Sequence, residues 1–142
     1  MSPRAWLRTA AVLTLIHAVL HTVGGVFAAP VPGPQTIAEA AMKANTFMVF
    51  GSLRSFWMFY QGLGLTISLF LTVEAVIFWL LGDLEEVAGT RLKPVLLTFA
   101  IGYAAFALIS RQHFFFAPVV TELLIAACLV MAFIRLRGSA TA

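Results

Sequence analysis

Two histidines four residues apart, His17 and His21, are the first residues of this chain that could support chemistry. Positions i and i+4 of a helix lie on one face, so this pair can bind a metal or flank the edge of a haem. The HAVLH segment has no glutamate between its histidines, so it lacks the general base of a zinc protease. The structural alternative is that both histidines form hydrogen bonds within a helical bundle.

Glu122 lies about two turns inside an apolar run, where an unpaired carboxylate is costly. It therefore needs a partner, and we expect a pair with an arginine or a histidine. Four such residues lie at a comparable predicted depth: Arg54, Arg111, His17 and His21. A functional alternative makes Glu122 a proton carrier or a metal ligand. A second acidic residue, Glu74, is expected to be protonated or to accept a hydrogen bond from Tyr103 or a threonine on another helix.

The segment from Gly51 to Gly64, GSLRSFWMFYQGLG, concentrates unusual side chains at the start of a long apolar run. Three- and four-residue steps predict one helical face that begins at Arg54 and continues through Trp57, Gln61, Gly64, Ser68 and Ala75. We expect this face to point inward. Arg54 could then clamp a carboxylate or phosphate with two hydrogen bonds, or it could reach out to lipid headgroups.

Aromatic residues gather near the same predicted membrane boundary: Trp57, Phe59, Tyr60, Phe114, Phe115 and Phe116. Aromatic belts are typical of membrane interfaces, and this is the expected role. The alternative is an aromatic-walled pocket for an isoprenoid, a quinone or a lipid tail, which requires apolar walls and a few convergent polar groups.

The composition identifies a membrane protein. Of 142 residues, 61% are hydrophobic and only 11% are charged, whereas about a quarter of the residues of a soluble domain are charged. The basic residues lie at the ends of apolar runs rather than in a cluster, which excludes nucleic acid as a partner. The single cysteine, Cys128, excludes an intramolecular disulfide and is expected to pack in the core.

These elements predict an all-α fold, a transmembrane four-helix bundle that forms one integral membrane domain over residues 1–142. Spans are expected at about 5–24, 52–81, 94–109 and 114–134. Between the first two, a proline loop at 29–35 leads to a short amphipathic surface helix at about 36–50, capped by Thr36. Residues 82–93 are expected to form a charged loop, and SRQH at 110–113 a polar turn.

The distribution of positive charge predicts the orientation. With four spans, the side that holds both termini carries six basic residues and the opposite side three: Arg4, Arg8, Arg91, Lys93, Arg135 and Arg137 against Lys43, Arg54 and Arg111. Because basic residues favour the cytoplasmic side, we expect both termini in the cytoplasm of a bacterium, with the chain in the inner membrane.

Four segments carry a resemblance to a known family: HTVGG at 21–25, MKANTF at 42–47, RSFWMFYQGLGL at 54–65 and FFFAP at 114–118. Together they resemble a family of small bacterial four-span membrane proteins of unassigned function, with HTxGG and RSxWxFYxGxGL motifs. The chain is also loosely similar to DoxX-like four-helix bundles. The family pattern often has an acidic residue where this chain has Met58, so the resemblance implies an architecture and a site region but no acid-based mechanism at that position.

The first functional hypothesis is a non-enzymatic membrane protein with a polar and aromatic pocket at the outer face, which binds a lipid-like, isoprenoid-like or small anionic ligand. Its predicted ligand-binding residues are His17, His21, Arg54, Trp57, Tyr60, Gln61, Arg111 and Glu122. A rival is a membrane enzyme or redox protein that uses His17, His21 and Glu122 with a metal, a haem or a quinone. A third hypothesis is an accessory subunit of a larger membrane complex or of a homo-oligomer.

Overall fold

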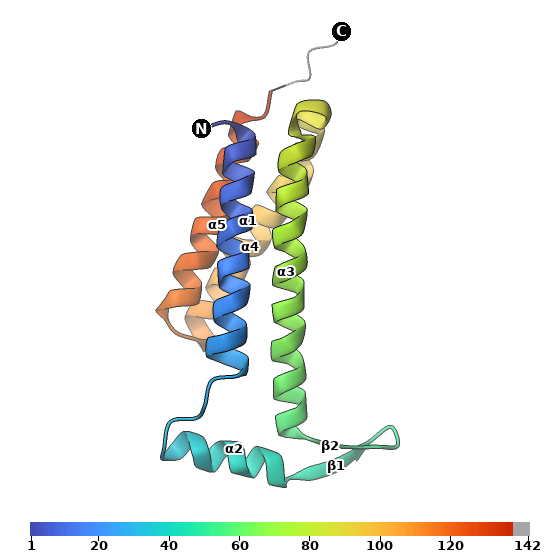
Figure 1. Cartoon of the computed structure of the whole chain (residues 1–142), viewed down its shortest axis with the longest axis vertical. Coiled ribbons are helices and arrows are strands. Elements are labelled where there is room, and N and C mark those ends of the chain that lie inside the picture. Colours follow the sequence, from blue (N-terminus) through green and yellow to red (C-terminus); the bar gives the residue numbers. More distant parts are fainter. Residues whose placement is uncertain (138–142) are drawn as a thin grey trace. The chain divides into compact units, whose positions relative to one another are not determined.

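A computed structural model of the chain describes residues 1–137, which form helices, one β-hairpin and short connecting loops (Figure 1). The elements in chain order are α1 (Pro3–His21), the π-helical turn η1 (Thr22–Val26), α2 (Pro34–Ala44), β1 (Thr46–Val49), β2 (Ser52–Ser55), α3 (Phe56–Ala88), the 3₁₀ turn η2 (Gly89–Leu92), α4 (Lys93–His113) and α5 (Phe116–Arg135).

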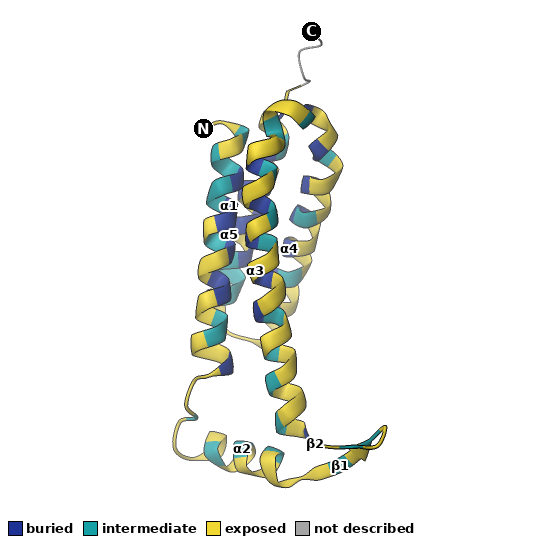
Figure 2. Ribbon diagram, turned by 45° about the vertical axis from the view of Figure 1, so that its right-hand side comes forward, coloured by how far each residue is buried: buried dark blue, intermediate teal, exposed yellow. Residues whose placement is uncertain are grey.

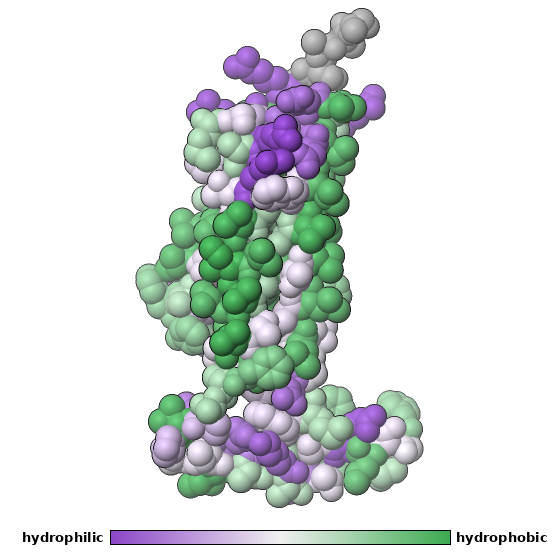
Figure 3. Space-filling view, in the orientation of Figure 1, coloured by the Kyte–Doolittle hydropathy of each residue, from purple (hydrophilic) through white to green (hydrophobic). Residues whose placement is uncertain are grey.

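Within residues 1–137, three continuous helical stretches are long and apolar enough to cross a membrane: Pro3–Val26, Phe56–His113 and Phe116–Arg135. The all-α class is therefore confirmed, and these stretches indicate a small multi-pass membrane protein. Many leucine, valine and phenylalanine side chains on the helices are exposed, as expected where a helix faces lipid rather than water. Figure 3 shows hydrophobic residues along the helices and hydrophilic residues gathered near the start of α1.

The described chain forms two compact units, and the boundary between them falls within α1 and within α3. The first, the four-helix unit, contains residues 1–17 and the described residues from Leu71 onward. It therefore contains most of α1, the second half of α3 and all of α4 and α5. The second, the hairpin unit, is Ala18–Phe70 and contains α2, both strands and the first half of α3.

The four-helix unit has a continuous apolar core. Fully buried side chains from its four helices include Leu7, Phe78, Leu96, Ile125 and Leu129. Figure 2 shows buried residues on the faces where these helices meet. Cys128 is buried among them, as the sequence predicts.

The hairpin unit contains the one sheet of the described chain, an antiparallel pair in which Thr46 is opposite Ser55 and Val49 is opposite Ser52. Phe50 and Gly51 form a two-residue turn, and both have positive φ, 44° and 79°. This is the geometry of a tight hairpin turn, which glycine adopts readily. For phenylalanine, the left-handed conformation costs about 1–2 kcal/mol.

The hairpin corrects two predicted boundaries. The surface helix runs over Pro34–Ala44 rather than 36–50, and Thr36 lies in its first turn, where its hydroxyl bonds the backbone of Gly33. The second long helix begins at Phe56 rather than residue 52. The alternation of exposed and half-buried residues in TFMV, followed by a glycine turn, favours paired strands over a helix here.

Two predicted connections are also wrong. Residues 82–88, expected in a charged loop, continue α3, because Leu81, Gly82 and Ala88 still contribute to the packed face of the helix. The SRQH segment does not connect two helices, because it is the last helical turn of α4. The connection to α5 consists only of Phe114 and Phe115. Pro94 lies in the first turn of α4, which begins at Lys93, one residue before the predicted start.

Candidate functional site

The buried carboxyl group of Glu122 is the most unusual feature of the four-helix unit. Glu122 lies roughly 9 Å along α5 from its first residue and is 1% exposed. The hydroxyl of Ser110 on α4 donates a 2.8 Å hydrogen bond to Oε1. The other oxygen, Oε2, is buried and has no hydrogen-bond partner among the described residues. The sequence predicts an arginine or histidine partner, whereas a serine fills that role.

His17 contacts α4 one helical turn before Ser110. It is 7% exposed, and its ring stacks on that of Phe106, with centroids 6.4 Å apart and planes 19° from parallel. Phe106 precedes Ser110 by four residues, so the two lie on consecutive turns of one α4 face. The contacts of His17 and Glu122 therefore fall on neighbouring turns of α4.

A second polar contact, which is partly buried, lies seven residues earlier on α4. The hydroxyl of Tyr103 donates a 2.6 Å hydrogen bond to Oε2 of Glu74 on α3. Tyr103 was one of the two kinds of hydrogen-bond donor expected for Glu74, and the structure selects it over a threonine. Tyr103, Phe106 and Ser110 thus give α4 one specific contact with each of the other three helices of the unit, and α4 organises its polar interior.

Exposed side chains surround the end of α4 nearest Ser110. Arg111 and His113 lie in its last turn and are exposed, as are Phe114, Phe115 and Phe116 beyond it. Arg111 forms no ion pair among the described residues. This end of the four-helix unit therefore combines a buried carboxyl group with an exposed cationic and aromatic rim.

The other predicted ligand-binding residues belong to the hairpin unit. Nε2 of His21 is 3.1 Å from the carbonyl oxygen of Gly64. Since a carbonyl only accepts, Nε2 carries the proton and donates. Gly64 also permits the close approach of Val26, because an added Cβ would lie 2.8 Å from Cγ2 of Val26. His21 thus joins the end of α1 to α3.

Aromatic stacking orders the beginning of α3. Trp57 stacks on Tyr60 with centroids 5.5 Å apart, and Nζ of Lys43 lies 4.7 Å from the Trp57 ring centre. Gln61 is half-buried. Arg54 is exposed in β2, and its guanidinium donates to the carbonyl of neighbouring Leu53. The predicted helical face that begins at Arg54 is therefore wrong at that residue.

The predicted ligand-binding residues thus divide between the units. The four-helix unit holds His17, Arg111 and Glu122, and the hairpin unit holds His21, Arg54, Trp57, Tyr60 and Gln61. Among residues 1–137, no group of three or more histidine, cysteine, aspartate or glutamate side chains is arranged to hold a metal ion.

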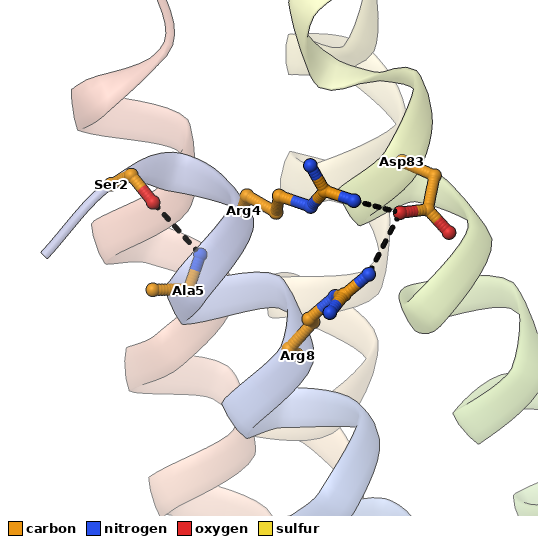
Figure 4. Close-up of polar contacts among 5 residues, drawn as sticks. All are labelled: Ser2, Arg4, Ala5, Arg8 and Asp83. Atoms are coloured by element: carbon orange, nitrogen blue, oxygen red, sulfur yellow. Dashed lines mark hydrogen bonds and ion pairs between the residues drawn. The ribbon is translucent and has the colours of Figure 1, made fainter.

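The four-helix unit also carries a charged clamp that is not predicted from the sequence. Arg4 and Arg8 of α1 both point at Oδ1 of Asp83 on α3, at 2.6 and 2.9 Å (Figure 4). The guanidinium of Arg8 also lies 4.3 Å from the ring centre of Trp79. The hydrogen bond from Arg8, supported by that from Arg4, lowers the pKa of Asp83. The three charges were visible in the sequence, but their pairing requires α3 to continue beyond Leu81.

No family model, curated protein or solved structure gives a significant match to this chain. Function must therefore be inferred from the side chains themselves.

Proposed function

We propose that the protein is a four-span integral membrane protein that binds a lipid-like ligand at the end of the four-helix unit where α4 meets α5.

The first part of this proposal is that the Phe56–His113 stretch makes two spans. Its 58 residues would extend roughly 87 Å as one straight helix, against a hydrocarbon core of about 30 Å. Gly89, with a φ of 51°, lies in the turn between α3 and α4. The Tyr103–Glu74 hydrogen bond then joins the two helices side by side.

The proposal includes the orientation with cytoplasmic termini in a bacterial inner membrane. The excess of basic residues on the side of the termini supports it. It also includes membership of the family of small four-span proteins that the HTxGG and RSxWxFYxGxGL motifs resemble. In this orientation, the end of α4 that carries Ser110 faces the outer leaflet.

The observation that carries ligand binding is the unsatisfied oxygen of Glu122. A buried carboxyl oxygen without a partner costs free energy, which a hydrogen-bond donor on a ligand would recover. A hydroxyl-bearing headgroup supplies such a donor. The exposed Phe114, Phe115 and Phe116 offer an apolar surface for the attached chain. A lipid-like ligand is favoured over a small anion because an anion would meet the carboxyl group of Glu122.

The rival enzyme or redox function has weaker support. Nε2 of His21 already donates to a backbone carbonyl, and Oε1 of Glu122 already accepts from Ser110. A visible absorption spectrum and metal analysis of the purified protein would test this rival directly.

The test of lipid binding compares two acidic residues with different partners. The protein is purified in lipid nanodiscs and irradiated with a photoactivatable isoprenoid that bears a free hydroxyl group. We expect labelling of the wild type and of Glu74→Gln, whose carboxyl group is already paired, and loss of labelling in Glu122→Gln. Equal labelling of all three proteins would contradict the proposal.

A further inference from the structure

The β-hairpin presents one apolar face that nothing in its own unit covers. Residues directly opposite each other share a face, so Met48 and Leu53 form a pair on one side of the sheet. Both are largely exposed, at 65% and 59%. The opposite face holds the Phe47–Arg54 pair. It is packed at Phe47, whose ring contacts those of Phe56 and Phe59 with centroids 4.8 and 6.0 Å away, and exposed at Arg54.

Phe50 extends this apolar face to the tip of the hairpin. Its side chain is fully exposed. Its positive φ is unfavourable for a bulky residue, and asparagine or glycine would satisfy the turn better. Hairpin stability therefore does not explain a phenylalanine here, whereas contact with an apolar environment does.

The helix that the hairpin leads into indicates which environment this is. β2 ends at Ser55, and the apolar helix α3, a candidate membrane span, begins at Phe56. The hairpin therefore lies at the membrane boundary if α3 crosses the membrane. A boundary contains both acyl chains and charged headgroups, so a segment placed there needs an apolar face and cations.

The charges of the same segment fit anionic headgroups. Residues 34–55 contain two basic residues and one acidic residue. Glu39 pairs with Lys43, which also lies over the ring of Trp57. Arg54 is exposed and has no acidic partner among the described residues, so its guanidinium is available to a lipid phosphate.

We infer that the hairpin is a membrane-interface anchor, in which Phe50 and the Met48–Leu53 face enter the headgroup–acyl boundary and Arg54 binds the phosphate of an anionic phospholipid. This inference rests on the proposal that α3 spans the membrane, but not on ligand binding by Glu122. Its partner is the lipid surface rather than a second copy of the chain.

Site-directed spin labelling tests the anchor in the full chain. Cys128 is replaced by alanine, and single cysteines are introduced at Phe50 or Met48. Two exposed positions of α3 serve as references: Leu69 within the apolar run and Glu86 at the charged end. The labelled proteins are placed in phosphatidylcholine vesicles with or without phosphatidylglycerol. Collision of each label with oxygen, which concentrates in lipid, is compared with collision with a water-soluble nickel chelate.

We expect the oxygen-to-nickel ratio at positions 48 and 50 to be several-fold above that at position 86 and to approach that at position 69. A ratio equal to that at position 86 would place the hairpin in water and overturn the inference. Low collision with both reagents, together with spin–spin broadening, would show a second copy covering the face and would also overturn it. A water-like label at position 69 would instead contradict the span itself.

The role of Arg54 has its own variant. In Arg54→Gln, we expect the label at position 50 to become shallower in vesicles that contain phosphatidylglycerol and to remain unchanged in phosphatidylcholine alone. An equal depth in both proteins and both lipids would overturn the assignment of Arg54 to the anionic headgroup.

Discussion

The phenol of Tyr103 donates a 2.6 Å hydrogen bond to the carboxyl group of Glu74, and this contact joins α4 to α3 inside the four-helix unit. Seven residues farther along α4, Ser110 makes the corresponding contact with Glu122 of α5. Both contacts place a neutral hydroxyl donor beside a carboxyl group. The two contacts differ in that Oε2 of Glu122 is buried and has no hydrogen-bond partner among the described residues.

Removal of the Tyr103 hydroxyl should destabilise the protein. In Tyr103→Phe, the half-buried carboxyl group of Glu74 loses its donor, and loss of one such hydrogen bond typically costs about 0.5–1.5 kcal/mol. The free energy of unfolding is measured by titration with SDS in mixed micelles. Tyr60→Phe is the control, because Tyr60 is exposed. The double variant Tyr103→Phe/Glu74→Leu should lose less stability than the sum of the single variants. Equal stability of Tyr103→Phe and Tyr60→Phe would show that the hydrogen bond contributes nothing.

Ser110→Ala should also destabilise the protein, by about 1–3 kcal/mol, because it removes the hydrogen bond that Glu122 receives. Thr98→Ala on the same helix is the matched control, since the Thr98 hydroxyl is exposed and only donates to the carbonyl of Pro94. The same micellar titration compares both variants with the wild type. The role of Ser110 is refuted if the two variants lose equal stability.

Two glycines of α3 should respond to alanine in opposite directions. In Gly64→Ala, the new Cβ would lie 2.8 Å from Cγ2 of the buried Val26, and overpacking of this kind costs about 1–3 kcal/mol. In Gly62→Ala, the Cβ meets nothing within 4 Å, so the higher helix propensity of alanine should stabilise α3 by up to about 1 kcal/mol. Thermal unfolding in detergent measures both. A neutral or stabilising Gly64→Ala would contradict the close approach of α3 to Val26.

The sequence predicted the features that depend on composition and helical period. The apolar runs indicate a helical membrane protein, and the need of a carboxyl group in an apolar run for a donor makes Tyr103 one of the two kinds of partner expected for Glu74. Cys128 was correctly placed in the core.

The features that depend on relative helix position were not predictable in the same way. Ser110 and Glu122 meet only because α4 and α5 pack in one particular register, and no local pattern encodes that register. The hairpin was missed because its strands are only four residues long, and apolar segments this short fit a helix as well as a strand. Because the sequence favours a helix over residues 52–55, it predicts the wrong element for Arg54, which lies in β2.

The clamp of Arg4 and Arg8 on Asp83 should make stability depend on pH. Asp83 lies beyond the apolar part of α3, and its pKa is lowered chiefly by the hydrogen bond from Arg8. A lowered carboxyl pKa contributes stability above the unfolded value, and this contribution is lost as the pH falls through the folded pKa. The thermal midpoint of the wild type should therefore fall below about pH 4, near the unfolded pKa of aspartate. Asp83→Asn should start with a lower thermal midpoint near neutral pH, and its midpoint should fall less on acidification.

The control for general charge effects is Glu86→Gln, a change at an exposed residue of the same helix end. Because the pair is exposed, added salt should reduce the difference between wild type and Asp83→Asn. Parallel pH profiles for wild type and Asp83→Asn would show that the clamp does not stabilise the folded protein.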